Sequence, residues 1–123
     1  MLQNMLLVGA GGFIGSALRF GSGQLLLKMF DSIQPIGTLF VNIIGSFLIG
    51  LVLGIFEKDD LLSVSWKMFL AVGLCGGFTT FSAFAFENLQ FLQTQQYLMS
   101  FIYISSSLVF GLVAVYFGFW LAK

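Results

Sequence analysis

The chain has 123 residues, of which 59% are hydrophobic and only 8% are charged, whereas soluble proteins carry about 25% charged residues. So few charges cannot cover a domain of this size with polar surface, and the outside is therefore expected to face lipid or partner chains. The net charge is zero, so no excess of basic residues indicates nucleic-acid binding.

Four segments are long and apolar enough to cross a membrane as helices, which requires about 20 residues each. They cover about residues 5–29, 38–56, 66–86 and 98–121, joined by the polar connections DSIQP, EKDDLLSVS and NLQFLQTQQY. We therefore predict an all-α membrane protein in which residues 1–123 form a single domain of four transmembrane helices.

The first segment contains glycines spaced as in a dinucleotide-binding turn. Gly9, Gly12 and Gly15 are three residues apart, but that motif requires a strand before it and a helix and second strand after it. The rest of the chain is predicted to be spanning helix, which argues against a nucleotide site. We interpret the glycines as packing residues, because Gly11 and Gly15 form a G-x-x-x-G motif that lets helix backbones approach in lipid.

Charges along the chain give a weak signal for membrane orientation. Arg19 lies inside the first span, where it either extends to the membrane surface or makes an internal vestibule attractive to anions. Lys58, Lys67 and Lys123 fall on one predicted side and Lys28 on the other, so the loop bias that sets orientation is small. We expect insertion in either direction and, because four helices are few to enclose a pathway, an oligomer.

The second segment carries polar residues on one face. Thr38, Asn42 and Ser46 are four residues apart, which places them on the same side of a helix. For Ser46 we favour a hydrogen bond that holds helices together. Asn42 either does the same or presents its amide donors to an anion. Gly50 and Gly54 repeat the G-x-x-x-G motif.

The third segment contains the stretch GLCGGFTTFSAFAFE, residues 73–87. Adjacent Gly76 and Gly77, followed by Thr79 and Thr80, weaken a helix, so we predict that the helix breaks here. Breaks at membrane depth are tolerated where they face protein or a water-lined cavity, and their free backbone groups bind ions in transporters and channels. The alternative is a simple kink that serves packing.

Aromatic rings follow the predicted break. Phe81 and Phe84 are three residues apart and so share a helical face. Such residues often face lipid or fill a core, but the positive edge of a ring also favours a small anion. In the fourth segment Tyr103 and Ser107 lie on one face.

Acidic residues are confined to the edges of the spans. Glu57 and Glu87 end the second and third segments, and no Asp or Glu lies at the centre of any predicted span. Pathways for cations and protons usually need such acids or histidine. The pattern therefore favours an anion route lined by hydrogen-bond donors.

Three motifs show a resemblance to a known family. They are GGFIGSALR at residues 11–19, GTLFVNIIGSFLIG at 37–50 and GLCGGFTTFSAF at 73–84. On these motifs the chain resembles the Fluc/CrcB fluoride channels over essentially its full length. One departure is that Ala83 and Ala85 stand where many relatives carry hydroxyl residues, so a pore role for those two hydroxyls is not carried over.

The resemblance implies a dual-topology antiparallel homodimer in the lipid bilayer, with two pores lined by both subunits. It also implies a structural Na⁺ at the dimer centre, bound by backbone carbonyls that correspond to Gly76 and Thr79. The residues that match pore or wall positions of the family are Asn42, Phe81, Phe84, Thr80, Ser82, Tyr103, Ser107 and the basic Arg19.

The expected function is passive, fluoride-selective export of the cytoplasmic ion across the plasma membrane, the inner membrane of a bacterium, and no enzymatic activity. The alternative is a small multidrug-resistance-type four-helix exporter. Such exporters depend on a glutamate in their first helix, whereas the first segment here has no acidic residue. A third interpretation is a pore-free assembly subunit held by glycine packing.

Overall fold

The computed structural model describes residues 1–30, 34–58 and 64–122. Three uninterrupted α-helices accompany a third segment that is built from several pieces. The uninterrupted helices are α1 (Leu2–Phe30), α2 (Gln34–Lys58) and α6 (Tyr97–Ala122). The pieces of the third segment are α3 (Val64–Lys67), the π-helix η1 (Met68–Cys75), α4 (Gly76–Phe78) and α5 (Ser82–Gln93).

Within the described residues, four helical stretches are long and apolar enough to cross a membrane, which confirms the predicted number of spans. One predicted connection is wrong: residues 88–97 were expected to join the third and fourth spans, but α5 runs to Gln93 and only residues 94–96 form a turn. The helix continues because Leu89, Phe91 and Leu92 keep it apolar, while Asn88 is buried in the protein. Asp31, Lys123 and the inner parts of the first two predicted connections lie outside the described residues.

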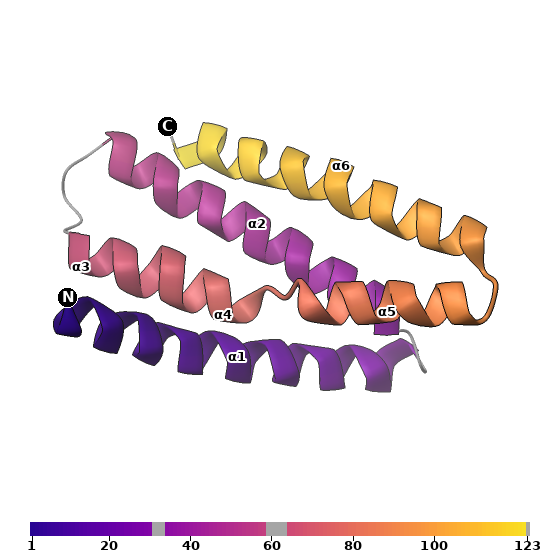
Figure 1. The fold of residues 1–123 in the computed structure, drawn as a ribbon. Helices are drawn as coiled ribbons and strands as arrows, with labels where there is room; N and C mark the ends of the chain where they lie inside the picture. The colour runs from indigo at the N-terminus through magenta and orange to yellow at the C-terminus, as the bar shows by residue number, and fades with distance from the viewer. Residues whose placement is uncertain (31–33, 59–63, 123) are drawn as a thin grey trace.

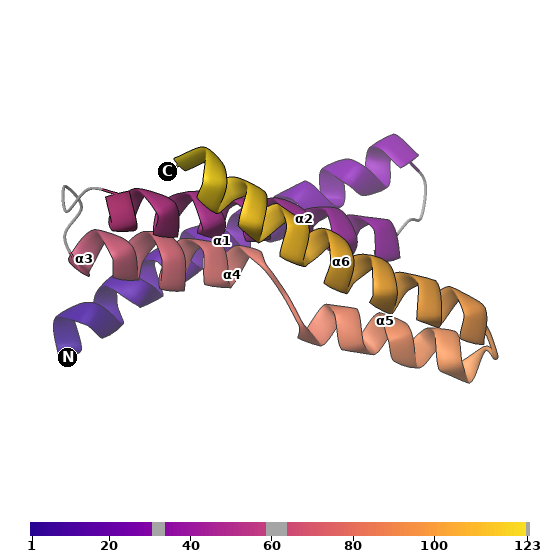
Figure 2. The same ribbon diagram turned by 90° about the horizontal axis from the view of Figure 1, so that it is seen from above.

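The helices form two closely packed pairs. Helix α1 lies along η1 and α4, and α2 lies along α6 (Figure 1). After α4 the chain crosses a short extended stretch, and α5 then lies beside the first half of α6, away from α1 (Figure 2). Both termini lie at the same end of the bundle as the start of α3, as expected from the predicted spans (Figure 1).

Glycines allow the helix backbones in each of these two pairs to pack closely. A Cβ atom on Gly15 would overlap the carbonyl oxygen of Leu74 and lie 2.8 Å from the nitrogen of Phe78. A Cβ on Gly50 in α2 would likewise overlap the carbonyl oxygen of Val115 in α6. Both obstacles are backbone atoms, which cannot rotate away. The predicted role of the G-x-x-x-G motifs in helix packing is therefore confirmed.

The third segment is broken, as predicted, but the break falls after the paired glycines. Gly76 has the helical angles φ −63° and ψ −39°, whereas Thr79 is extended at φ −86° and ψ 160°. Gly77 stays helical because it packs on α1, where its Cβ would lie 2.6 Å from the carbonyl oxygen of Gly12. The preceding π-helix, Met68–Cys75, was not expected from the sequence.

The outer surface is strongly apolar. Large hydrophobic side chains such as Phe13, Phe20, Leu98 and Tyr116 are each at least two-thirds exposed. The buried hydrophobic residues among those described are mostly small, and include Val41, Ala71 and Ala114. The bundle therefore hides backbone and small side chains at its centre and directs its bulky side chains outward, where lipid or a partner chain would cover them.

Candidate functional site

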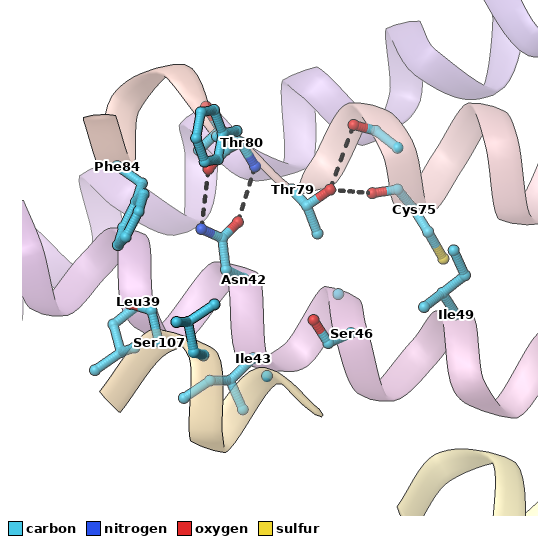
Figure 3. Close-up of a pocket in the computed structure, with 15 residues that line it drawn as sticks. Leu39, Asn42, Ile43, Ser46, Ile49, Cys75, Thr79, Thr80, Phe84 and Ser107 are labelled. Atoms are coloured by element: carbon cyan, nitrogen blue, oxygen red, sulfur yellow. Dashed lines mark hydrogen bonds between the residues drawn. The ribbon is translucent and has the colours of Figure 1, made fainter. Parts of the chain in front are cut away.

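The break in the third segment is held by the side chain of Asn42. Its amide nitrogen Nδ2 donates to the carbonyl oxygen of Thr80 at 2.9 Å, and its Oδ1 accepts from the Thr80 backbone N–H at 2.8 Å (Figure 3). In a continuous helix, other backbone groups would pair with the N–H and the carbonyl of Thr80. Here the Asn42 side chain pairs with both. Because unpaired backbone groups are costly at membrane depth, this amide stabilises the extended stretch.

Threonine hydroxyls satisfy the two helix ends at the break. Thr79 Oγ1 donates to the carbonyl oxygen of Cys75 at 3.0 Å, at the end of η1. Thr80 Oγ1 accepts from the backbone N–H of Ala83, in the first turn of α5, at 3.2 Å, and lies 3.3 Å from Ser82 Oγ. Gly45 of α2 leaves room for this stretch, since a Cβ there would overlap the methyl group of Thr79.

Arg19 contacts the segment just before the break from another helix, α1. It projects from α1, and its Nε donates to the carbonyl oxygen of Gly77 at 3.2 Å. Gly77 is in the last turn of α4, where a positive charge interacts favourably with the carbonyl end of the helix. Part of the arginine charge is therefore compensated by a backbone carbonyl inside the bundle.

An open cavity of about 380 Å³ lies beside the break. Its polar lining comes from α2, from α6 and from the extended stretch between α4 and α5, and includes Asn42, Ser46, Thr79, Thr80 and Ser107, as Figure 3 shows. Leucine and isoleucine side chains of α2 complete the wall, together with Phe81, Phe84 and Gly76. The cavity therefore combines a few hydrogen-bonding groups with an apolar wall.

Three aromatic rings lead away from this cavity. The ring centroids of Phe81 and Phe84 are 5.8 Å apart at an interplanar angle of 45°, and those of Phe84 and Tyr103 are 5.0 Å apart at 55°. Both pairs are tilted, with geometry between a stacked and an edge-to-face arrangement. Phe81 is 78% exposed in the single chain, so its ring needs lipid or another chain to cover it.

Glu87 is a buried acid that the sequence interpretation placed at the end of a span. It lies within α5 and is only 7% exposed. Its Oε2 accepts from the hydroxyl of Thr38 at 2.7 Å, and its Oε1 accepts from the hydroxyl of Tyr103 at 2.6 Å. Glu87 and Arg19 both line a second cavity of about 350 Å³, to which Thr38 and Thr80 also contribute.

Thr80 lines both cavities and therefore lies between them. Glu87 in turn also lines a third cavity of about 430 Å³, which opens beside the turn after α5 and is bordered by Gln90, Thr94 and Gln96. Polar groups therefore follow one another from the turn, past Glu87 and Thr80, to the hollow beside Asn42. A chain of hydroxyls and amides inside an apolar bundle suits the passage of a small polar species.

Residues 6–119 match the family described as "CrcB-like protein, Camphor Resistance (CrcB)". The chain belongs to this CrcB family. It is 45% identical to the "Fluoride-specific ion channel FluC" of Gloeothece citriformis, over 99% of this chain and 98% of the relative. It is 43% identical to the protein of the same name from Flavobacterium psychrophilum, with coverage of 99% and 98%. A third relative of that name, from Azobacteroides pseudotrichonymphae, is 41% identical over 100% of this chain and 98% of its own length.

The structure of this CrcB-family chain brings most of the predicted site residues together. Seven of them line the first cavity: Gly76, Thr79, Thr80, Phe81, Phe84, Asn42 and Ser107. Ser82 joins them through Thr80, and Arg19 lies in the adjoining cavity. Tyr103 stands behind Phe84 with its hydroxyl on Glu87. Their roles in conduction stay predictions.

Sequence reasoning missed Glu87 and Gly45. Glu87 follows Phe84 by three residues and so shares its helical face, but the predicted end of the span at residue 86 hides this signal. Gly45 lies between Asn42 and Ser46, where its lack of a side chain matters only once the break is known to pass over it. Both belong to the site by position.

Proposed function

We propose that this chain forms a passive, fluoride-selective channel that exports cytoplasmic fluoride. The observation that carries the proposal is the cavity at the broken third segment, where an amide, hydroxyls and phenylalanine rings converge inside a bundle of four membrane-length helices. The names of the full-length relatives support fluoride as the ion. A channel of this kind lets the ion cross the membrane and is not an enzyme.

The lining suits a small, strongly hydrated anion. Asn42 uses one amide N–H on the Thr80 carbonyl, and its second N–H is a further donor. Further partial positive charges are available to the ion. They are the hydroxyl hydrogens of Ser107 and Thr80 and the ring edges of Phe81 and Phe84. Several weak sites in series replace water without holding the ion too tightly to leave.

Arginine and glutamate in the adjoining cavity tune its charge. Glu87 alone would repel an anion, but its two oxygens accept hydrogen bonds from the hydroxyls of Thr38 and Tyr103, and Arg19 lines the same space. The pair makes the vestibule close to neutral overall. An anion would then be selected by donor geometry at the cavity beside Asn42 rather than by strong attraction at the entrance.

The functional unit that we propose is an antiparallel, dual-topology homodimer with two pores, inserted as a multi-pass protein in the bacterial inner membrane. Exposed Phe81 and Gly76 support this assembly, because a second copy against them would close the cavity wall that is 78% exposed at Phe81 in the single chain. Each copy, a single domain of residues 1–123, would supply half of the contact surface between the two copies.

A structural Na⁺ at the dimer centre fits the backbone near the break. In a continuous helix the carbonyl oxygen of Gly76 would accept the N–H of Thr80, but that N–H donates to Asn42. Among the described residues, the Gly76 oxygen accepts a long hydrogen bond of 3.5 Å from the Thr79 hydroxyl. Carbonyl oxygens of Gly76 and Thr79 are therefore the groups that we propose to bind Na⁺, which prefers hard oxygen ligands.

The test is fluoride efflux from liposomes that contain the purified protein, measured with a fluoride-selective electrode in the presence and absence of sodium. The proposal expects rapid sodium-dependent fluoride efflux and little chloride efflux. A protein that passes chloride but retains fluoride would refute the selectivity. Proton-coupled efflux of cationic drugs would instead favour an exporter, and no flux of any ion would favour a pore-free subunit.

A further inference from the structure

Helix α5 carries Phe84 and Glu87 but has little backbone packing of its own. It starts after the extended stretch at residues 79–81, ends at the turn of residues 94–96 and has only 12 residues. No glycine lies within it, so it lacks the close backbone contact that fixes η1 and α4 on α1. Side chains must therefore determine how α5 is rotated about its own axis.

A buried pair, Asn88 and Ser100, joins α5 to α6. The two residues are 8% and 4% exposed. Ser100 Oγ donates to Asn88 Oδ1 at 2.9 Å, and Asn88 Nδ2 donates to the carbonyl oxygen of Phe84 at 2.9 Å. One amide group thus connects the neighbouring helix to the backbone of the residue whose ring lines the cavity.

We call the contact between α5 and α6 the seam. The Asn88–Ser100 pair lies in this seam, together with residues of the site. Phe84, Glu87 and Asn88 are at positions i, i+3 and i+4 of α5, which form one face. On α6, Ser100 and Tyr103 are three residues apart, and Tyr103 contacts both Glu87 and Phe84. A rotation of α5 by one residue, about 100°, would break these contacts together.

We propose that the Asn88–Ser100 hydrogen bond is a positioning device that fixes the rotation of α5 and thereby the angle of the Phe84 ring at the cavity. Asparagine is a poor helix former, and a buried amide is costly when unpaired. Asn88 therefore holds one rotational state of α5, because only that state pairs its amide with Ser100. A plain apolar contact would tolerate neighbouring rotations.

This inference rests on the proposed channel function for its flux readout, so a second readout is independent of conduction. Ser100→Ala removes the hydroxyl, and Asn88→Leu removes the amide at similar volume. Ser105→Ala is the matched control, because it makes the same change on the same helix at a residue outside the three cavities. All variants are compared as purified protein of equal homogeneity.

Ser100→Ala is expected to slow fluoride efflux about fivefold, the effect of one lost hydrogen bond, and to lower the preference for fluoride over chloride, while Ser105→Ala behaves as the unchanged protein. The double variant Asn88→Leu/Ser100→Ala should be no slower than Asn88→Leu alone. If the wild type conducts fluoride and Ser100→Ala keeps both its rate and its selectivity, the positioning role is wrong and the channel function stands.

The independent readout is the ¹⁹F resonance of 4-fluorophenylalanine placed at position 84. Its shift depends on the angle to the Tyr103 ring, 5.0 Å away. Ser100→Ala should move or broaden this resonance, and Ser105→Ala should not. An unmoved resonance in Ser100→Ala overturns the inference whether or not the protein conducts, whereas a wild type without fluoride efflux refutes only the proposed function.

Discussion

The two halves of the third segment are held in place by different kinds of contact. The first half, η1 and α4, packs on α1 through glycines whose missing side chains let backbone meet backbone. The second half, α5, is held by hydrogen bonds of Asn88 and Glu87 and by the ring of Tyr103. In lipid, glycine contacts give a rigid anchor, whereas polar side chains select one orientation.

The break lies between these two halves. We call η1 and α4 the anchored half, and α5 the adjustable half, because side chains alone set its rotation. Asn42 and Arg19 bind the two sides of the break, one from α2 and one from α1. The ring of Phe84 belongs to the adjustable half, and the carbonyl oxygen of Gly76 belongs to the anchored half. Variants in the two halves should therefore fail in different ways, the first by loss of folding and the second by loss of conduction.

The largest effect is expected from Gly15→Ala in the anchored half. The new Cβ would meet backbone atoms of Leu74 and Phe78, so the helices must separate, at a cost of about 3 kcal/mol or more. Thermal unfolding in detergent and the yield of monodisperse protein measure this. Gly21→Ala is the control, because a Cβ there meets nothing within 4 Å and should stabilise the helix by about 1 kcal/mol. Equal stability of the two variants would contradict the anchor.

The next largest effect is expected from Asn42→Asp at the break. A carboxylate would face the Thr80 carbonyl oxygen, where the amide now donates, and it would add a negative charge beside the cavity. Fluoride efflux from liposomes should fall about a hundredfold, as for the loss of a hydrogen bond combined with a buried charge. Normal efflux in this variant would show that Asn42 serves packing alone.

A smaller effect is expected from Phe84→Ile in the adjustable half. Isoleucine keeps an apolar contact but removes the ring edge, so fluoride efflux should slow about tenfold, in line with the energy of aromatic contacts. Phe81→Ile tests the exposed ring of the pair in the same way. Chromatography should show an unchanged assembly in both. Unaltered efflux in the two variants would remove the aromatic rings from the proposed route.

The smallest effect is expected at the end of α5. Gln95 has a positive φ of 60° in the turn before α6, a conformation that costs a non-glycine residue about 1 kcal/mol. Gln95→Gly should raise the melting temperature slightly and leave fluoride efflux unchanged. A large change in efflux would mean that strain in this turn, and not the seam with α6, sets the position of α5.

Features of the fold that depend on local pattern could be predicted from the sequence. The apolar runs predicted four spans, the G-x-x-x-G motifs predicted close helix pairs, and glycines beside threonines predicted a break. Asn42, Phe81 and Phe84 were singled out because their spacing placed them on defined faces. These residues line one cavity in the structure.

Features that depend on a partner from another helix could not be predicted. Thr79 becomes extended where Asn42 is available to take the Thr80 backbone, and the sequence alone does not reveal that pairing. Glu87 follows the apolar run of residues 66–86, which predicts the end of a span, but Thr38 and Tyr103 supply donors that allow it inside. Tertiary contacts decided both outcomes.

The π-helix of Met68–Cys75 makes the anchored half sensitive to chain length. Each π-turn takes up more residues than an α-turn, so this stretch turns the glycine face relative to the exposed Trp66 at the start of the segment. Deletion of a single residue there would let an ordinary helix form and swing Gly73 and Gly77 off α1. Keeping this stretch apolar is therefore not enough to preserve the glycine contacts on α1; its number of residues must be kept as well.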